Sequence, residues 1–134
     1  AWRAYVAKNP DLACGKLLAR TCPQLSAAEA AAYDAPFPDA RYKAGARRFP
    51  QLVPGKTDDP GAAISRQARD WLKNAWAGES RMAVGAQDPV LGVPVMRRLR
   101  SWIRNCPEPL VIAEGGHFLQ EWGDEGATWF LSRT

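Results

Sequence analysis

The fold is decided by the stretch Val111-Ile-Ala-Glu-Gly-Gly-His117-Phe-Leu-Gln-Glu121, in which the only histidine of the chain follows a short apolar run. A second apolar run, Met82-Ala-Val-Gly-Ala-Gln-Asp88, ends in a carboxylate. These runs predict strands over residues 81–85 and 109–113. An amphipathic helix is expected after each strand, over 93–105 and from 124 onward. Strand, helix, strand, helix in this order predicts a right-handed βαβα unit with parallel strands. Asp88 and His117 are therefore expected at the same carboxyl edge of the sheet.

An acid that precedes a base matches the chain order of the last two members of an α/β-hydrolase triad. The nucleophile of such a triad would come before Asp88, but no Gly-x-nucleophile-x-Gly elbow between a strand and a helix is found there. The sequence therefore predicts the second half of a hydrolase. Simpler interpretations remain open: His117 as a structural or surface histidine, and Asp88 as a turn residue before Pro89.

Residues 1–55 predict short helices without a strand, because prolines interrupt the segment repeatedly. Ser26-Ala-Ala-Glu29 has the spacing of a capping box and predicts a helix that runs to Tyr33. A second helix is expected over 40–49. Asp59-Pro60 predicts the N-cap and first residue of a longer helix with its apolar residues on one face. The Pro- and Gly-rich stretch around residue 55 predicts the boundary between a helical cap region, 1–55, and a core region, 56–134.

Composition favours a soluble globular protein. The cysteine usage favours a reducing compartment, the cytoplasm. The 134 residues carry a formal net charge of +4. The basic pairs Arg47-Arg48 and Arg97-Arg98 are not accompanied by a nucleic-acid-binding motif. No apolar stretch has the length of a membrane helix. Cys14, Cys22 and Cys106 form no C-x-x-C pair, so neither zinc nor a disulfide framework is indicated, although a Cys14–Cys22 bridge is an alternative. No metal, cofactor, nucleic-acid or membrane partner is expected.

Five stretches, spread from residue 35 to residue 121, together carry a resemblance to a known family. They are Ala35-Pro-Phe-Pro-Asp39, Tyr42-Lys-Ala-Gly-Ala-Arg-Arg-Phe-Pro50, Asp88-Pro-Val-Leu-Gly92, Asn105-Cys-Pro-Glu-Pro109 and Gly116-His-Phe-Leu-Gln-Glu121. With them, nearly the whole chain resembles the C-terminal half of a haloalkane dehalogenase of the α/β-hydrolase superfamily. The resemblance implies a partial α/β-hydrolase fold, in which a helical cap is followed by a βαβα unit of the parallel sheet.

The resemblance also implies roles for individual residues. Asp88 would be the triad acid, and His117 the base that activates water. Trp2 would hold the halide through its indole N–H. The substrate pocket would be lined by Phe49, Pro50, Val53 and Leu91. Each role has a simpler alternative, since Trp2 could be frayed or merely buried and the pocket residues could be ordinary core.

The function implied is hydrolysis of a haloalkane by water to an alcohol and a halide, without a cofactor. The nucleophilic aspartate is expected in an N-terminal half of the fold, on the same chain or a separate piece, so the isolated chain is expected to be inactive. One alternative is an epoxide or ester hydrolase of the same fold, for which Tyr5, Tyr33 and Tyr42 are candidate cap tyrosines. The other is a non-catalytic truncated relic that associates with itself.

Overall fold

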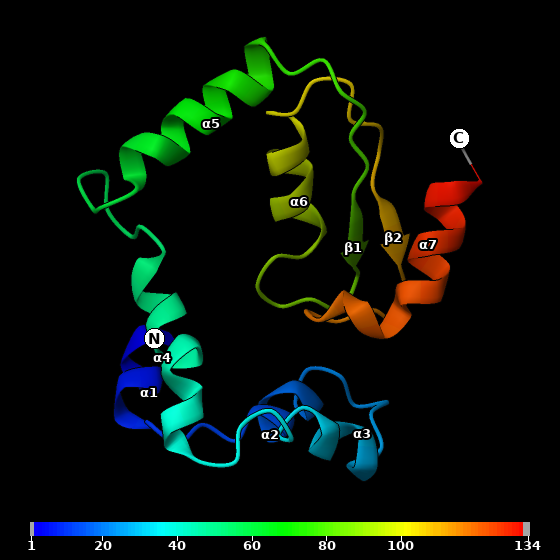
Figure 1. The fold of residues 1–134 in the computed structure, drawn as a ribbon. Helices are drawn as coiled ribbons and strands as arrows, with labels where there is room; N and C mark the ends of the chain where they lie inside the picture. Colours follow the sequence, from blue (N-terminus) through cyan, green and yellow to red (C-terminus); the bar gives the residue numbers. More distant parts are fainter. Residues whose placement is uncertain (1, 133–134) are drawn as a thin grey trace. The chain divides into compact units, whose positions relative to one another are not determined.

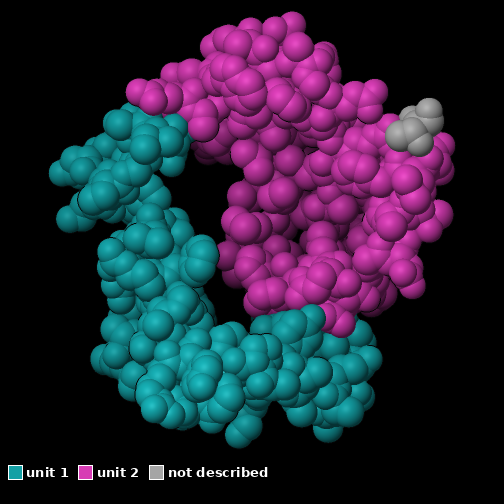
Figure 2. All heavy atoms as spheres, in the orientation of Figure 1, with its two compact units in different colours: residues 1–66 teal, residues 67–134 magenta. Residues whose placement is uncertain are grey.

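The chain changes from helices alone to helices with a small sheet along its length (Figure 1). This structure is a computed structural model, and it describes residues 2–132. The described residues divide into two compact units between Arg66 and Gln67 (Figure 2). The division falls within helix α5 (Ala62–Asn74), eleven residues beyond the boundary expected from composition. Cap and core roles for the two regions stay predictions.

Unit 1 is built from short helices that pack in pairs. Helix α1 (Trp2–Lys8) contacts α4 (Ala44–Leu52), and α2 (Cys14–Ala19) contacts α3 (Ala27–Ala32). A 3-10 helix, η1 (Ala40–Lys43), leads directly into α4, so the helix expected over 40–49 forms in two parts. Val6, Leu12, Cys22 and Ala62 are buried apolar residues of this unit.

The predicted capping box at the start of α3 is confirmed. The hydroxyl of Ser26 accepts the N–H of Glu29 at 3.2 Å, and the Glu29 carboxylate accepts the N–H of Ser26 at 2.8 Å. The hydrogen bond from the Ser26 N–H holds the pKa of Glu29 below its ordinary value. These reciprocal bonds satisfy two of the N–H groups that a helix start leaves unpaired.

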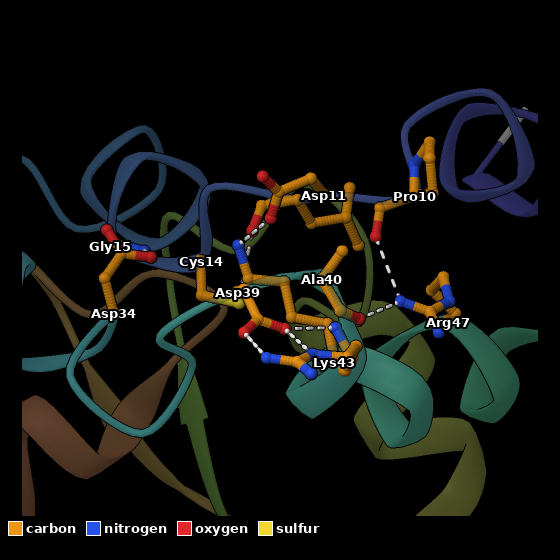
Figure 3. Close-up of polar contacts among 11 residues, drawn as sticks. Pro10, Asp11, Cys14, Gly15, Asp34, Asp39, Ala40, Lys43 and Arg47 are labelled. Atoms are coloured by element: carbon orange, nitrogen blue, oxygen red, sulfur yellow. Dashed lines mark hydrogen bonds and ion pairs between the residues drawn. The ribbon is translucent and has the colours of Figure 1, made fainter.

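Polar side chains tie the segments between the helices of unit 1 together (Figure 3). Lys43 is only 7% exposed, and its Nζ donates to the Asp11 carboxylate at 2.5 Å. That hydrogen bond raises the pKa of Lys43, so the ammonium form is favoured. Arg47 donates from α4 to the carbonyls of Pro10 and Ala40. The loop between α1 and α2 is thereby fixed to η1 and α4.

The start of α5 differs from the sequence prediction. Asp59 does not cap the helix with Pro60 as its first residue; the helix begins at Ala62, after Gly61 with a φ of 86°. The Asp59 carboxylate instead accepts the N–H groups of Gly55 and Lys56. Those backbone hydrogen bonds lower the pKa of Asp59. The Asp59 carboxylate therefore closes a turn over residues 55–59, and the helix begins three residues later.

Unit 2 contains the sheet. Strands β1 (Ala83–Gly85) and β2 (Leu110–Ile112) pair in parallel, with Ala83 opposite Leu110 and Gly85 opposite Ile112. Helix α6 (Val93–Arg100) connects them and contacts β1. After β2, the 3-10 helix η2 (Leu119–Trp122) leads into α7 (Gly123–Leu131). The predicted order of strand, helix, strand and helix is confirmed.

Several elements are shorter than their sequence patterns suggested. Each strand has three residues rather than five: β1 begins two residues later than expected, and β2 is one residue shorter at each end. Helix α6 ends at Arg100, and residues 101–105 form turns, with Asn105 at a φ of 57°. A left-handed residue cannot continue an α-helix, so α6 could not have included residue 105 as the apolar spacing suggested.

Candidate active site

Asp88 and His117 meet where the two strands end. Asp88 lies in the turn after β1, and His117 lies in the loop after β2. The Nδ1 atom of His117 is 3.0 Å from both carboxylate oxygens of Asp88. The side chain of Asp88 is 6% exposed and that of His117 is 29% exposed. Because a carboxylate can only accept, Nδ1 carries the shared proton, which leaves Nε2 for proton exchange.

Asp88 is at once a turn residue and the partner of the histidine. Its Oδ1 accepts the N–H groups of Val90 at 2.7 Å and Leu91 at 3.0 Å. Burial acts to raise the pKa of Asp88, but these two N–H groups and His117 outweigh it, so its pKa lies below the ordinary value. The acid is therefore a fixed, ionised acceptor at neutral pH, as a residue that orients an imidazole must be.

Backbone contacts bring the two loops together. The N–H of Ala86 donates to the Ile112 carbonyl, and the N–H of Gln87 donates to the Gly115 carbonyl, both at 2.9 Å. A Cβ on Gly85 would lie 2.3 Å from the Gly115 oxygen, closer than real Cβ contacts come. The strand ends can approach this closely only because residue 85 is glycine. Sequence reasoning did not identify Gly85, because a glycine at the end of a strand is a general sign of close backbone approach and does not reveal the partner.

A small pocket of about 130 Å³ opens beside the pair. Leu91, expected from the sequence to line the substrate pocket, is part of its wall. The lining residues are Ala83, Val84, Gly85, Asp88, Leu91, Met96, His117 and Leu119. Apart from Asp88 and His117, these residues are apolar. A water molecule or an ester bound here would therefore lie next to the His117 imidazole in apolar surroundings. Met96 and Leu119 were not identified from the sequence.

The remaining predicted site residues gather in unit 1. Trp2, Phe49, Pro50 and Val53 line one hollow of about 630 Å³, together with Arg3 and Ala46, which sequence reasoning missed. The hollow is open, since Phe49 is 72% and Trp2 50% exposed. The Trp2 ring stacks on that of Tyr5, with centroids 5.6 Å apart. Trp2 is therefore neither frayed nor buried, but forms part of an accessible apolar surface.

The described residues, 2–132, were also compared with the requirements of a metal site, a disulfide and a membrane-spanning helix. Within that range, no group of three or more His, Cys, Asp or Glu side chains is placed to hold a metal ion. None of Cys14, Cys22 and Cys106 takes part in a disulfide, so the alternative of a Cys14–Cys22 bridge is wrong. None of the described helices combines the length and apolar character needed to cross a bilayer.

Comparison with known proteins shows which family this arrangement resembles. The chain is 42% identical over 125 residues to a haloalkane dehalogenase of Mycobacterium marinum. It is 36% identical over 129 residues to a haloalkane dehalogenase of Psychrobacter cryohalolentis. A tetrameric haloalkane dehalogenase from Paraglaciecola agarilytica matches its fold with a TM-score of 0.88 at 41% identity. No protein-family profile matches the chain.

These matches cover nearly all of the chain but less than half of each relative. They span 90% of this chain and 40% of the M. marinum protein, and 96% of this chain and 43% of the P. agarilytica protein. The predicted resemblance to haloalkane dehalogenases and the partial α/β-hydrolase fold are confirmed. The share of the relatives that is covered is consistent with the predicted C-terminal half.

The low pKa of Asp88 makes a prediction for stability. A carboxylate whose pKa is lower in the folded than in the unfolded chain stabilises the fold above the unfolded value of about 4, and loses this effect as the pH falls through the folded value. Asp88→Asn should therefore lower the free energy of unfolding by about 1–2 kcal/mol at neutral pH. The deficit should shrink below about pH 4.

Chemical denaturation across this pH range measures the effect. Asp58→Asn, which removes an exposed carboxylate, is the matched control. The prediction is contradicted if Asp88→Asn lowers the free energy of unfolding by the same amount at neutral and at acidic pH. The stabilising contacts of Asp88 would then not depend on its ionised form.

Proposed function

We propose, on the basis of its kinship with haloalkane dehalogenases, that this chain supplies the acid, the base and part of the substrate pocket for hydrolytic dehalogenation. The reaction converts a haloalkane and water into an alcohol, a halide and a proton. The observation that carries the proposal is the His117–Asp88 contact of 3.0 Å beside an apolar pocket. Because the chain spans 40% of the length of a curated relative, the rest of the site is proposed to lie on further polypeptide.

In the proposed mechanism, a carboxylate on that further polypeptide attacks the halogen-bearing carbon. The carbon–halogen bond breaks, the halide leaves with the bonding electrons, and an alkyl ester remains. His117 then takes a proton from water at Nε2, and the resulting hydroxide attacks the ester carbonyl. The bond between the acyl carbon and the alkyl oxygen then breaks, and His117 returns its proton to the leaving alkoxide, which departs as the alcohol. The carboxylic acid that remains loses its proton to solvent, which restores the carboxylate. Asp88 keeps Nδ1 protonated throughout, so the imidazole presents its free nitrogen to the water.

The hollow in unit 1 is proposed to receive the apolar part of the substrate and the departing halide. Its walls are mainly apolar, with Phe49, Pro50 and Val53 beside Trp2. A weakly hydrated halide is suited to an N–H donor in apolar surroundings, because such a donor stabilises the anion and still lets it leave. The indole N–H of Trp2 is the proposed donor.

The further polypeptide is proposed to complete the core around unit 2. Two parallel strands are short of a stable sheet, since parallel sheets are normally covered by helices on both faces. Within the described residues, α6 and α7 bury none of their side chains, although α6 carries Val95 and Leu99 and α7 carries Phe130. Their apolar side chains are available to a partner segment. A cytoplasmic location is part of the proposal, supported by cysteines that form no disulfide with one another.

Replacement of His117 by Gln tests the reaction. The test protein is a chimera in which this chain replaces the corresponding segment of the M. marinum relative. His117→Gln should leave the first displacement intact and block ester hydrolysis, so the alkyl ester should accumulate on the carboxylate after incubation with a 1-haloalkane. Intact-protein mass spectrometry measures the added alkyl group.

Two controls complete this test. The unchanged chimera should turn over without accumulating the ester, and a His117→Gln chimera whose nucleophilic carboxylate is changed to an amide should gain no mass. Substrate binding without any adduct in the His117→Gln chimera would assign His117 a structural role and remove the proposed mechanism.

Replacement of Trp2 by Phe separates dehalogenation from other hydrolyses. The change keeps most of the apolar volume and removes the N–H, so halide binding by the chimera should weaken by about 1.5–3 kcal/mol, the contribution of one charge-assisted hydrogen bond. Halide titration followed by tryptophan fluorescence measures it. Trp71→Phe is the matched control, because Trp71 is 52% exposed and Trp2 is 50% exposed. Equal halide affinity in Trp2→Phe and the unchanged chimera would favour an epoxide or ester hydrolase.

A further inference from the structure

Gln87 is bound twice to the segment that carries His117. Its backbone N–H donates to the Gly115 carbonyl at 2.9 Å. Its side-chain Nε2 donates to the Ala113 carbonyl at 3.2 Å. Gln87 directly precedes Asp88 in the sequence, and Ala113 and Gly115 lie four and two residues before His117. One residue therefore joins the acid loop to the base loop through both its backbone and its side chain.

We propose that Gln87 is a positioning residue that sets the distance between Asp88 and His117. Backbone hydrogen bonds already hold this segment at Ile112, through the N–H of Ala86, and at Gly115, through the N–H of Gln87. The side-chain bond to Ala113 adds a third point between these two and restrains the turn that leads from β2 to His117. Because a hydrogen bond weakens steeply when its N–H···O angle falls below about 120°, a rotation of the loop would weaken the contact of Nδ1 with the carboxylate.

The side chain of Gln87 has no comparable part in the core. Gln87 is exposed and lies outside the group of residues that line the small pocket. Its removal therefore creates no cavity, and the amide touches no reacting atom in the proposed mechanism. The effect of a substitution should appear in the geometry of the Asp88–His117 pair rather than in overall stability. The consequence for catalysis rests on the proposed function, whereas the consequence for the pair does not.

The proposal is tested in the 134-residue chain itself by the tautomer of His117. His117 is the only histidine, so its ring nitrogens need no assignment in a long-range proton–nitrogen NMR spectrum. Above about pH 8, where an ordinary imidazole is neutral, Asp88 should hold His117 with its proton on Nδ1. Gln87→Met keeps the length and removes the donor. It should shift the tautomer ratio toward Nε2–H by about two- to tenfold, the equivalent of one neutral hydrogen bond.

Three further variants separate positioning from a general effect of substitution. Gln87→Glu replaces the donor by an acceptor and should shift the ratio at least as far as Gln87→Met. Gln87→Lys keeps a donor at similar reach and should restore the ratio of the unchanged chain. Gln67→Met, on the exposed surface of α5, is the matched control and should leave the ratio as it is. Denaturation should give similar free energies of unfolding for the unchanged chain and the Gln87 variants.

Three results would overturn the proposal: an unchanged ratio in Gln87→Met, an equal shift in Gln67→Met, or a predominant Nε2–H tautomer already in the unchanged chain. In the chimera, the same Gln87→Met change should lower kcat for halide release, through slower ester hydrolysis, while formation of the ester keeps its rate. A tautomer shift in a chimera that does not release halide would retain Gln87 as a positioning residue and reject the proposed function.

Discussion

The close approach of the two strand ends is the constraint on which the candidate site depends. Gly85 allows the backbone of one loop to lie against the carbonyl of Gly115 in the other. Parallel pairing of β1 and β2 places the loops at one edge of the sheet, and the N–H of Gln87 ties them together. The contact of His117 with Asp88 follows from this backbone arrangement. The N–H groups of Val90 and Leu91 then keep the acid ionised and fixed.

Much of unit 2 was predictable, because its signals are local. Apolar runs that end in Asp88 and His117 gave the strands, their order and the meeting of the two side chains. The limits of the elements were less predictable: the apolar spacing continues to residue 103, but α6 ends at Arg100 and Asn105 is left-handed. The roles of Gly85 and Gln87 depend on contacts between loops about thirty residues apart in sequence, which no local pattern contains.

Unit 1 shows what a family resemblance adds to local patterns. The capping box at Ser26 followed from spacing alone, whereas the gathering of Trp2, Phe49 and Val53 around one hollow had no periodic signal and was expected only from the resemblance. Asp59 shows where a local pattern was misleading, because an Asp-Pro pair fits the first residues of a helix and a turn before the helix equally well. The burial of Lys43 against Asp11 was also hidden, since its partner is 32 residues away.

The central claim is that Asp88 and His117 form the acid–base part of a site whose nucleophile lies on other polypeptide. Halide release from short 1-haloalkanes tests it most directly, measured for the purified 134-residue chain and for the chimera with the remaining segment of a haloalkane dehalogenase. The account predicts no release above background by the chain alone and sustained release by the chimera. Turnover by the pure chain, or a folded chimera that binds substrate and releases no halide, would contradict it.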